Sequence, residues 1–164
     1  MLHQWWELDP FRDGGERRNG RSARTRVLIA DDHRLFAEAL IVSLGTDERI
    51  EIVGHALDGW EAFELASELR PDVVLMDLSM PRLDGIEATH RLTSVLPEAK
   101  VVMLSASADA GDMLRATEAG AVLYLTKESS MTEVLSAVLE VAQRPAATGS
   151  PNGKRRRMRL RHGV

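Results

Sequence analysis

The sequence contains no cysteine, which excludes disulfide frameworks, cysteine-ligated zinc sites and thiol catalysis. Aromatic residues make up only 4% of the chain, so its core has to be built mostly from aliphatic side chains. The longest uninterrupted apolar run, residues 121–125, has five residues, far fewer than the ~20 that a membrane-spanning helix needs. The N-terminus includes Glu7 and Asp9 and has no apolar stretch of secretory type. We therefore predict a cytoplasmic location.

Hydrophobic residues nonetheless account for 44% of the 164 residues, which excludes an intrinsically disordered protein and suits one domain with some residues to spare. The formal net charge of −4 is unevenly distributed. Residues 1–25 carry +1, residues 26–144 carry −11 from ten basic and 21 acidic side chains, and residues 145–164 carry +6. An acidic domain binds duplex nucleic acid poorly, because neutralising phosphates needs clustered Lys and Arg. It suits divalent cations or a basic partner.

The composition divides the chain into three parts. Residues 1–25 lack hydrophobic periodicity, and we expect them to form a flexible N-terminal extension. Residues 26–143 carry the regular pattern of a folded domain. Residues 144–164 begin like a linker and end in a basic tail, which we expect to be disordered.

Short apolar runs alternate with helical patterns along the predicted domain. The runs lie at 27–30, 50–56, 73–76, 101–104 and 121–125. Four of the five are continuous, which is typical of strands covered on both faces of a parallel sheet. Between them, apolar residues recur at the spacing of one helical face, as in Ala88, Leu92, Val95 and Leu96. The pattern predicts an α/β fold with a doubly wound parallel sheet, whose ligand binds at the carboxyl ends of the strands.

Three predicted helices begin with the spacing of a capping box, in which the N-cap side chain and a Glu three residues later exchange hydrogen bonds with the backbone. The pairs are Asp58 and Glu61, Asp84 and Glu87, and Ser130 and Glu133. Each pair predicts the first turn of a helix.

Polar residues lie where the predicted strands end. Asp31 and Asp32 follow the first strand, Asp77 the third and Ser105 the fourth, and the fifth leads to Lys127. Taken singly, each has an ordinary explanation as a helix cap, a turn residue or a solvated charge. Together, three carboxylates on one edge repel one another unless a cation neutralises them. Oxygen ligands without His or Cys indicate Mg²⁺, and a lysine and a hydroxyl beside them suit a phosphoryl group. The pattern describes a carboxylate that accepts phosphate.

Four motifs that carry these residues resemble bacterial response-regulator receiver domains of two-component systems. They are VLIADDH (27–33), DVVLMDLSMPRLDG (72–85), MLSA (103–106) and GAVLYLTK (120–127). The Asp-Asp-His start and the segment IVGHALDG (52–59) are similar to the NarL/FixJ subfamily. The resemblance extends over about residues 25–143.

The resemblance implies a flavodoxin-like fold with strand order 2-1-3-4-5 and five helices. Asp77 would then be the phosphoacceptor, with a sensor histidine kinase as the donor and Mg²⁺ as the cofactor. Asp31 and Asp32 would form the acidic pair of the metal site. Asp32, Asp77 and the backbone carbonyl of Ser79 would be the Mg²⁺ ligands.

The resemblance also implies a conformational switch. The Ser105 hydroxyl would move toward the new phosphate, Lys127 would be its counter-charge, and Tyr124 would swing inward. Phosphorylation would then change the surface of the fourth helix, fifth strand and fifth helix. Because residues 134–142 are more apolar than one buried stripe requires, we expect homodimerisation or partner docking there. The protein would be a signalling phosphoacceptor that promotes only its own phosphorylation and dephosphorylation, and no enzyme.

The C-terminal segment departs from the subfamily, whose members usually continue into a helix-turn-helix domain. Residues 144–164 are too few for that domain. We expect either a stand-alone receiver or a transcription regulator that is cut off after its linker. The six basic residues within 154–161 could attract polyanions, but DNA binding through them is expected to be weak and without sequence preference.

Two other classes fit less well. A phosphohydrolase of the haloacid-dehalogenase type needs a second acid two residues after its nucleophile, and here that position is Ser79. A nucleotide- or flavin-binding module needs a glycine-rich turn after the first strand. Asp31 and Asp32 stand there instead and would repel phosphate.

Overall fold

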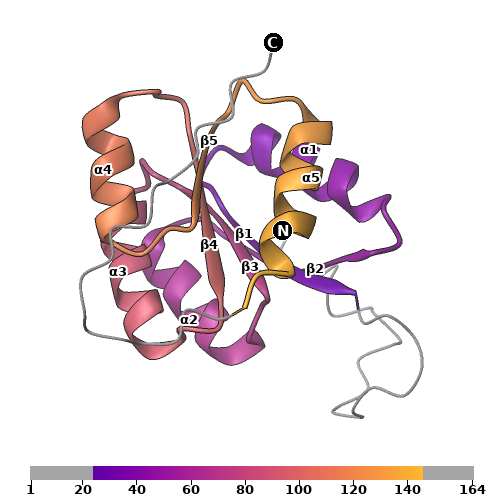
Figure 1. The fold of residues 1–164 in the computed structure, drawn as a ribbon, viewed down its shortest axis with the longest axis horizontal. Coiled ribbons are helices and arrows are strands. Elements are labelled where there is room, and N and C mark those ends of the chain that lie inside the picture. The colour runs from indigo at the N-terminus through magenta and orange to yellow at the C-terminus, as the bar shows by residue number, and fades with distance from the viewer. Residues whose placement is uncertain (1–23, 146–164) are drawn as a thin grey trace.

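The computed structural model describes residues 24–145. Residues 1–23 and 146–164 lie outside the described part, and with them most of the expected extension and the basic tail. Five strands alternate with five helices (Figure 1), in the order β1 (Thr25–Ala30), α1 (Arg34–Gly45), β2 (Ile50–Ala56), α2 (Gly59–Leu69), β3 (Val73–Asp77), α3 (Gly85–Val95), β4 (Lys100–Ser105), α4 (Ala110–Glu118), β5 (Leu123–Thr126) and α5 (Met131–Ala142). No helix in this part of the chain is long and apolar enough to cross a membrane.

The strands form one parallel sheet in the order β2-β1-β3-β4-β5. Helices α1 and α5 cover one face, and α2, α3 and α4 cover the other (Figure 1). This is the flavodoxin-like, doubly wound fold predicted from the sequence. From β1 the chain first crosses to β2 on one side and then returns to β3 on the other side. In folds of this kind, ligands bind beyond the carboxyl ends of the strands at such a reversal, here those of β1 and β3.

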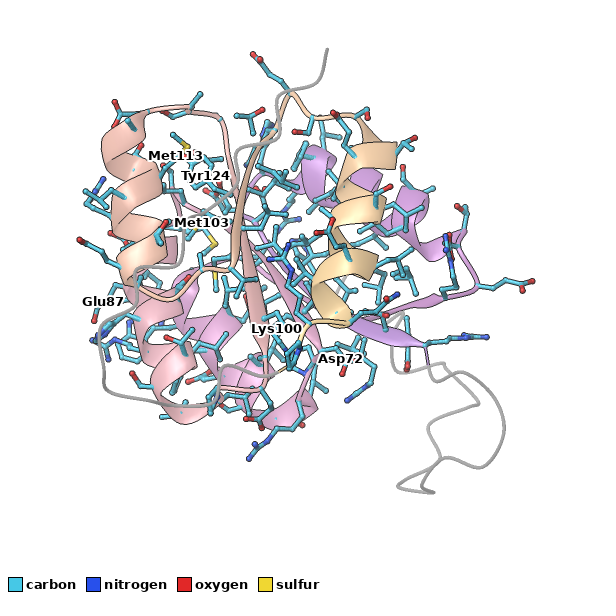
Figure 2. The ribbon with its side chains drawn as sticks, viewed as in Figure 1. Asp72, Glu87, Lys100, Met103, Met113 and Tyr124 are labelled. Atoms are coloured by element: carbon cyan, nitrogen blue, oxygen red, sulfur yellow. The ribbon has the colours of Figure 1, made fainter. Side chains whose placement is uncertain are left out.

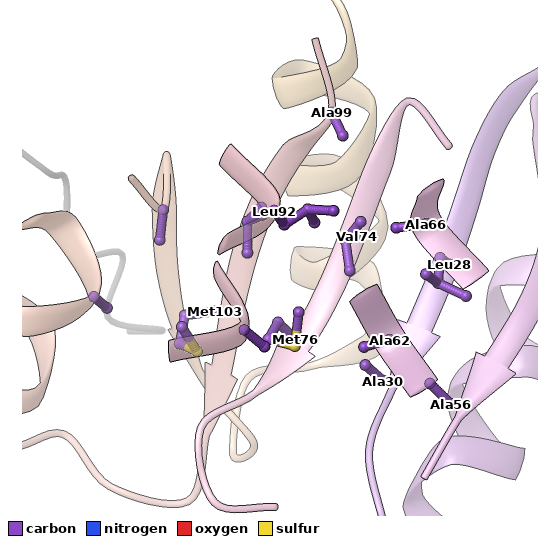
Figure 3. Close-up of a cluster of buried hydrophobic side chains, with 14 of the residues drawn as sticks. Leu28, Ala30, Ala56, Ala62, Ala66, Val74, Met76, Leu92, Ala99 and Met103 are labelled. Atoms are coloured by element: carbon purple, nitrogen blue, oxygen red, sulfur yellow. The ribbon is translucent and has the colours of Figure 1, made fainter. Parts of the chain in front are cut away.

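The central strands bury side chains on both faces. Leu28, Val74 and Met103 belong to the layer between the sheet and α2, α3 and α4 (Figure 3). Ile29 and Leu75 belong to the layer between the sheet and α1 and α5. Successive residues of a strand point to opposite faces, so a strand buried on both sides needs an unbroken apolar run. Burial on both faces therefore explains why these strands appear in the sequence as continuous apolar runs.

Strand β5 begins at Leu123, two residues later than the apolar run that predicted it. The amide of Ala121 donates to the Ala116 carbonyl at 3.0 Å, and Gly120 adopts a φ of 106°. A left-handed residue after a helix lets the following amides satisfy the last carbonyls of that helix. Ala121 therefore completes the end of α4 and does not start the strand.

The expected buried face of α3 is wrong at one position. Val95 is 58% exposed, whereas Ala88 and Leu92 are fully buried. Residues four apart lie above one another on a helix, so these two define a narrow stripe that reaches the sheet. Val95 lies three residues beyond Leu92 and falls outside that stripe.

The three predicted capping boxes share the N-cap bond but differ in the second bond. Only the pair that begins at Ser130 forms the complete reciprocal box. The aspartates at the other two starts cap α2 and α3, but their glutamates bond elsewhere. Glu61 accepts from the Leu57 amide at 2.7 Å, and Glu87 accepts from Arg91 Nε at 2.9 Å.

The broad apolar face predicted for α5 packs in large part against the sheet. Leu135 and Leu139 are partly buried and pack against the same layer as the helix's fully buried residues. The layer between α5 and the sheet thus uses more of the helix than one narrow stripe. The large hydrophobic side chains that are exposed in the described part are Leu35, Val42, Val95 and Leu114.

Candidate functional site

The predicted site residues lie at or near the carboxyl-terminal ends of the strands, at one end of the sheet. Asp77 is the last residue of β3 and is paired with Leu104 of β4, while Ser105 ends β4 and is paired with Thr126 of β5. Asp31 directly follows β1. Since parallel strands end on the same side, the register brings these side chains to a common level. The gathering predicted from the sequence is therefore present.

The three aspartates form a compact cluster. Asp31, Asp32 and Asp77 each offer one carboxylate oxygen, and these oxygens lie within 4.8 Å of one another. Asp31 and Asp77 are buried, with 2% and 5% of their surface exposed, whereas Asp32 is exposed. Two carboxylates are thus enclosed by protein and a third borders solvent. The cluster is open on one side to an ion or a reactant.

The ammonium of Lys127 enters this cluster from the end of β5. Its Nζ lies 2.7 Å from Asp31 Oδ2 and 3.2 Å from Asp77 Oδ1. The Lys127 amide donates to the Ser105 carbonyl at 2.8 Å, which anchors the lysine backbone to β4. Nζ also lies 4.9 Å from the centre of the Phe36 ring, a favourable arrangement for a cation over an aromatic face. This contact could not be predicted from the sequence, because Phe36 has the pattern of an ordinary apolar residue of α1.

Charge and burial shift the pKa of Asp77 upward. Burial raises it to about 6, and the neighbouring Asp31 and Asp32 act in the same direction, against the lowering effect of Lys127. Burial lowers the pKa of Lys127, but the hydrogen bond to Asp31 and the charge of Asp77 outweigh burial and leave it above its ordinary value. Lys127 is therefore charged at neutral pH. One ammonium does not compensate three carboxylates, so the site retains a demand for positive charge.

The donor set fits a hard divalent cation. Asp31 Oδ2 is buried, and within the described residues its close partner is the Lys127 ammonium at 2.7 Å. All the candidate ligand atoms are oxygens, which suits Mg²⁺ and disfavours zinc or copper. The residues present can hold Mg²⁺.

Ser105 and Tyr124 meet at the loop between β4 and α4. Ser105 is buried, and its Oγ accepts a hydrogen bond from the Ser107 amide at 3.1 Å. Tyr124 is fully buried, and its hydroxyl donates to the Ser107 carbonyl at 2.8 Å. Figure 2 shows its ring beside Met103 and Met113, with which it shares a hydrophobic layer. Tyr124 thus points inward in this structure, and burial raises the pKa of its phenol while a hydrogen bond with Ser105 opposes the rise.

Ser79 lies on the exposed loop between β3 and α3, two residues after Asp77. The loop closes tightly, because the Gly85 amide donates to the Leu78 carbonyl at 2.9 Å. A β-carbon on Gly85 would collide with the Asp77 carbonyl. Glycine therefore allows α3 to begin directly against the residue that carries the central carboxylate.

Two histidines near the cluster contact Asp31, one at its carboxylate and one at its backbone carbonyl. The His33 amide donates to Asp31 Oδ1 at 2.8 Å, and His33 is the N-cap of α1. His55 Nε2 lies 2.9 Å from the Asp31 carbonyl. Sequence reasoning missed His55, because nothing local to β2 indicates which backbone its side chain meets.

Comparison with known proteins supplies the family. Residues 27–139 match the response regulator receiver domain, and the chain belongs to that family. Transcriptional regulatory protein LiaR of Bacillus subtilis is 40% identical over 126 residues, which are 77% of this chain and 57% of LiaR. Response regulator protein VraR of Staphylococcus aureus is 37% identical over 118 residues, 72% of this chain and 56% of VraR. The chain spans about half the length of these relatives.

Solved structures agree with the fold. The signal receiver domain of NarL from Mycobacterium tuberculosis has a TM-score of 0.72 at 35% identity, over 74% of this chain and 98% of that one. The response regulator domain of Thermotoga maritima CheB has a TM-score of 0.69 at 31% identity, over 74% and 98%. The protein is therefore a receiver domain of the NarL type, from a family of two-component signalling proteins. Receiver domains bind Mg²⁺ through acidic residues and interact with histidine kinases.

Proposed function

We propose that Asp77 is the phosphoacceptor of this receiver domain and that its donor is the phosphohistidine of a sensor histidine kinase. The P–N bond of the donor breaks as a P–O bond to the Asp77 carboxylate forms, and the histidine leaves with a proton from solvent. The observation that carries this assignment is the Lys127 ammonium, which contacts Asp31 and Asp77 together. A cation held there meets the charge that a phosphoryl group brings to Asp77.

The same proposal assigns the metal site. Asp31, Asp32, Asp77 and the backbone carbonyl of Ser79 would hold Mg²⁺. The bound ion supplies the positive charge that lets an anionic phosphoryl group approach a carboxylate. The excess of carboxylates over cations in the cluster supports this assignment.

The remaining site residues act after transfer. Lys127 stays beside Asp77 and balances the added negative charge. The Ser105 hydroxyl is at the end of the neighbouring strand and can donate to a phosphoryl oxygen. Ser105 and Tyr124 both bond to Ser107, so a movement of Ser105 is passed to the loop before α4. This loop connects the site with the surface of α4, β5 and α5.

That surface is the proposed output. Leu114 on α4 is 59% exposed and offers an apolar contact for homodimerisation or for a partner. By analogy with LiaR, whose name describes a transcriptional regulatory protein, the output is regulation of transcription through the whole protein. The protein is a phosphoacceptor and no enzyme with an external substrate, and the cytoplasmic location predicted from its sequence belongs to the same proposal.

The test is phosphorylation by acetyl phosphate, followed by intact mass. With Mg²⁺, the wild type is expected to gain one phosphoryl group in an acid-stable, hydroxylamine-labile bond. EDTA stops the reaction, Asp77→Asn abolishes it, and Asp32→Ala slows it by weakening the metal site. Asp84→Asn is the matched control, since Asp84 caps α3 and asparagine keeps that cap. If Asp77→Asn gains the same label at another residue, the assignment of Asp77 is wrong.

A further inference from the structure

Asp58 connects the start of α2 to the loop that follows Asp77. Its Oδ1 accepts from the amides of Trp60 at 2.9 Å and Glu61 at 3.0 Å, which caps the helix. Its Oδ2 accepts from Arg82 Nη1 at 2.9 Å. The two oxygens therefore have separate tasks, one within α2 and one between elements. Only 10% of the Asp58 side chain is exposed, against 68% for Arg82.

The backbones meet at the same place. The Gly59 amide donates to the Leu83 carbonyl at 3.1 Å, and a β-carbon on Gly59 would collide with that carbonyl. Arg82 has a φ of 64°, in the left-handed region that a non-glycine residue rarely adopts. The loop thus keeps an unfavourable backbone conformation at Arg82, the residue whose side chain reaches Asp58. We call Asp58, Gly59, Arg82 and Leu83 the loop clamp.

The clamp joins two segments, and each of them adjoins one half of the acidic cluster. The loop over residues 78–84 begins directly after Asp77 and includes Ser79. The segment just before Asp58 holds the other half, because the Asp31 amide donates to the Ala56 carbonyl at 3.0 Å and His55 contacts the Asp31 carbonyl. One segment, residues 55–59, therefore contacts both the residue that follows β1 and the loop that follows β3.

We propose that Asp58 and Arg82 are positioning residues for Mg²⁺ binding, an inference that rests on the proposed function of the Asp77 site. Mg²⁺ requires near-octahedral geometry and short ligand distances. A loop that contributes a ligand must therefore be held in one conformation before the ion arrives. The ion pair between Asp58 and Arg82 holds the loop against α2 without touching the ion. Supporting contacts of this kind govern metal affinity.

The chain offers a matched control for the test. Arg70 is the other non-glycine residue of the described part with a positive φ, 51°. It also forms an ion pair between elements, with Glu98 at 3.0 Å, and 63% of its side chain is exposed. It caps the opposite end of α2. Arg82→Gly and Arg70→Gly therefore remove the same strain and the same kind of ion pair, but only Arg82 belongs to the loop that follows Asp77.

The measurement is the dissociation constant for Mg²⁺, from calorimetric titration of the full chain. Arg82→Gly is expected to bind Mg²⁺ about tenfold more weakly than the wild type, in the range that loss of a supporting contact costs. Arg70→Gly is expected to match the wild type. Arg82→Lys keeps a cation within reach of Asp58 and should recover most of the affinity.

A second variant keeps the proposal testable if Arg82→Gly does not fold. Asp58→Asn retains an oxygen for the α2 cap but loses the charge that faces Arg82, and it should reproduce the weaker binding. At saturating Mg²⁺, Asp58→Asn should be phosphorylated at nearly the wild-type rate, whereas the Mg²⁺ concentration for half the maximal rate should rise about tenfold. A residue that only stabilises the fold would change neither binding value.

Three outcomes overturn the proposal. They are unchanged Mg²⁺ affinity in Arg82→Gly or Asp58→Asn, equal weakening in Arg70→Gly, and no recovery in Arg82→Lys. These outcomes are distinct from a failure of the proposed function. A wild type that binds Mg²⁺ but is not phosphorylated at Asp77 refutes the phosphoacceptor assignment, and the comparison of Mg²⁺ affinities still decides the role of the clamp.

Discussion

Lys127 Nζ lies 2.7 Å from Asp31 Oδ2, although the strands that deliver the two residues are separated in the sheet by β3 and β4. The ion pair therefore passes over the ends of two intervening strands, and Asp77 at the end of β3 lies beneath it. Both side chains are largely buried, with 16% of Lys127 and 2% of Asp31 exposed. The pair closes the carboxylate cluster on the β5 side.

Replacing Lys127 by methionine should separate metal binding from phosphoryl transfer. The variant keeps the length of the side chain but leaves three carboxylates without their ammonium. Mg²⁺ should bind at least as tightly as to the wild type, because the cluster becomes more negative. Phosphorylation by acetyl phosphate should be slower by at least tenfold, since no cation receives the new charge on Asp77. Calorimetry and intact mass measure the two effects.

Lys100→Met is the control for that experiment. Lys100 is 9% exposed, and its Nζ contacts the Glu98 carbonyl at 3.0 Å. Figure 2 shows it with Asp72 at the end of the sheet opposite Tyr124. This variant should keep both Mg²⁺ affinity and phosphorylation rate. Weaker Mg²⁺ binding in Lys127→Met would contradict the role given to Lys127.

The raised pKa of Asp77 predicts a specific dependence of stability on pH. Burial and the neighbouring carboxylates raise this pKa from the ordinary 3.8 to about 6 in the folded protein. Between these values the folded state holds a proton that the unfolded state has lost, so the free energy of unfolding falls as pH rises from about 4 to about 6. Asp77→Asn removes this loss. Without divalent cations, it should stabilise the protein by about 1–2 kcal/mol at pH 7.5, after discounting for solvent screening, and by almost nothing at pH 4.

Urea unfolding in EDTA at the two pH values measures this effect. Asp47→Asn is a control of opposite sign, because the hydrogen bonds from Arg49 lower the pKa of Asp47 to about 2. The ionised Asp47 carboxylate therefore stabilises the folded protein above about pH 4, and this stabilisation is lost as pH falls toward 2. Mg²⁺ should cancel the stabilisation by Asp77→Asn. An equal gain at pH 4 and pH 7.5 would show that ionisation of Asp77 is not its cause.

Gly85 should be intolerant of any side chain. A β-carbon on Gly85 would collide with the Asp77 carbonyl, which is backbone and cannot move away cheaply. Gly85→Ala is therefore expected to destabilise the protein by about 1–3 kcal/mol and to weaken Mg²⁺ binding by displacing Asp77. Gly45→Ala is the matched control, because a β-carbon there meets nothing within 4 Å. Gly45 is the last residue of α1, so this control should be neutral or stabilising by about 0.4–1 kcal/mol. Thermal unfolding of the two variants and the wild type measures these changes in stability, and a Gly85→Ala variant as stable as Gly45→Ala would contradict the prediction.

The sequence was sufficient to predict the cluster, because parallel strands share one carboxyl edge and each strand was visible as an apolar run. Asp31, Asp77 and Lys127 could be placed together without knowing any distance. The strand order was different, because apolar runs do not show which strands are neighbours. It was predicted only from the resemblance to receiver domains. The distances of 2.7 Å and 3.2 Å from Lys127 to the two carboxylates required the structure.

The loop clamp had no signal of its own in the sequence. Asp58 was predicted as a helix cap, which it is, but the spacing says nothing of its second oxygen. The partner Arg82 lies 24 residues away and has a left-handed conformation that usually marks glycine. Val95 was predicted to be buried but is exposed. A stripe of apolar residues predicts which face of a helix meets the sheet, but not how wide the contact is. Local patterns predict elements, and contacts between elements need the fold.

Tyr124→Phe should separate the hydrogen bond of this residue from its packing. The hydroxyl donates to the Ser107 carbonyl at 2.8 Å, and the ring is fully buried. Phenylalanine fills the same space but leaves that carbonyl without its donor, so the free energy of unfolding should fall by about 1 kcal/mol. Hydrogen exchange should become faster in the loop over residues 106–109, whereas Asp77 should be phosphorylated at the wild-type rate. Tyr124→Ala also removes the ring and should cost about 3–5 kcal/mol. If Tyr124→Phe leaves both stability and loop exchange unchanged, the hydroxyl does not hold this loop, and the proposed path from Ser105 to α4 through Ser107 loses its support.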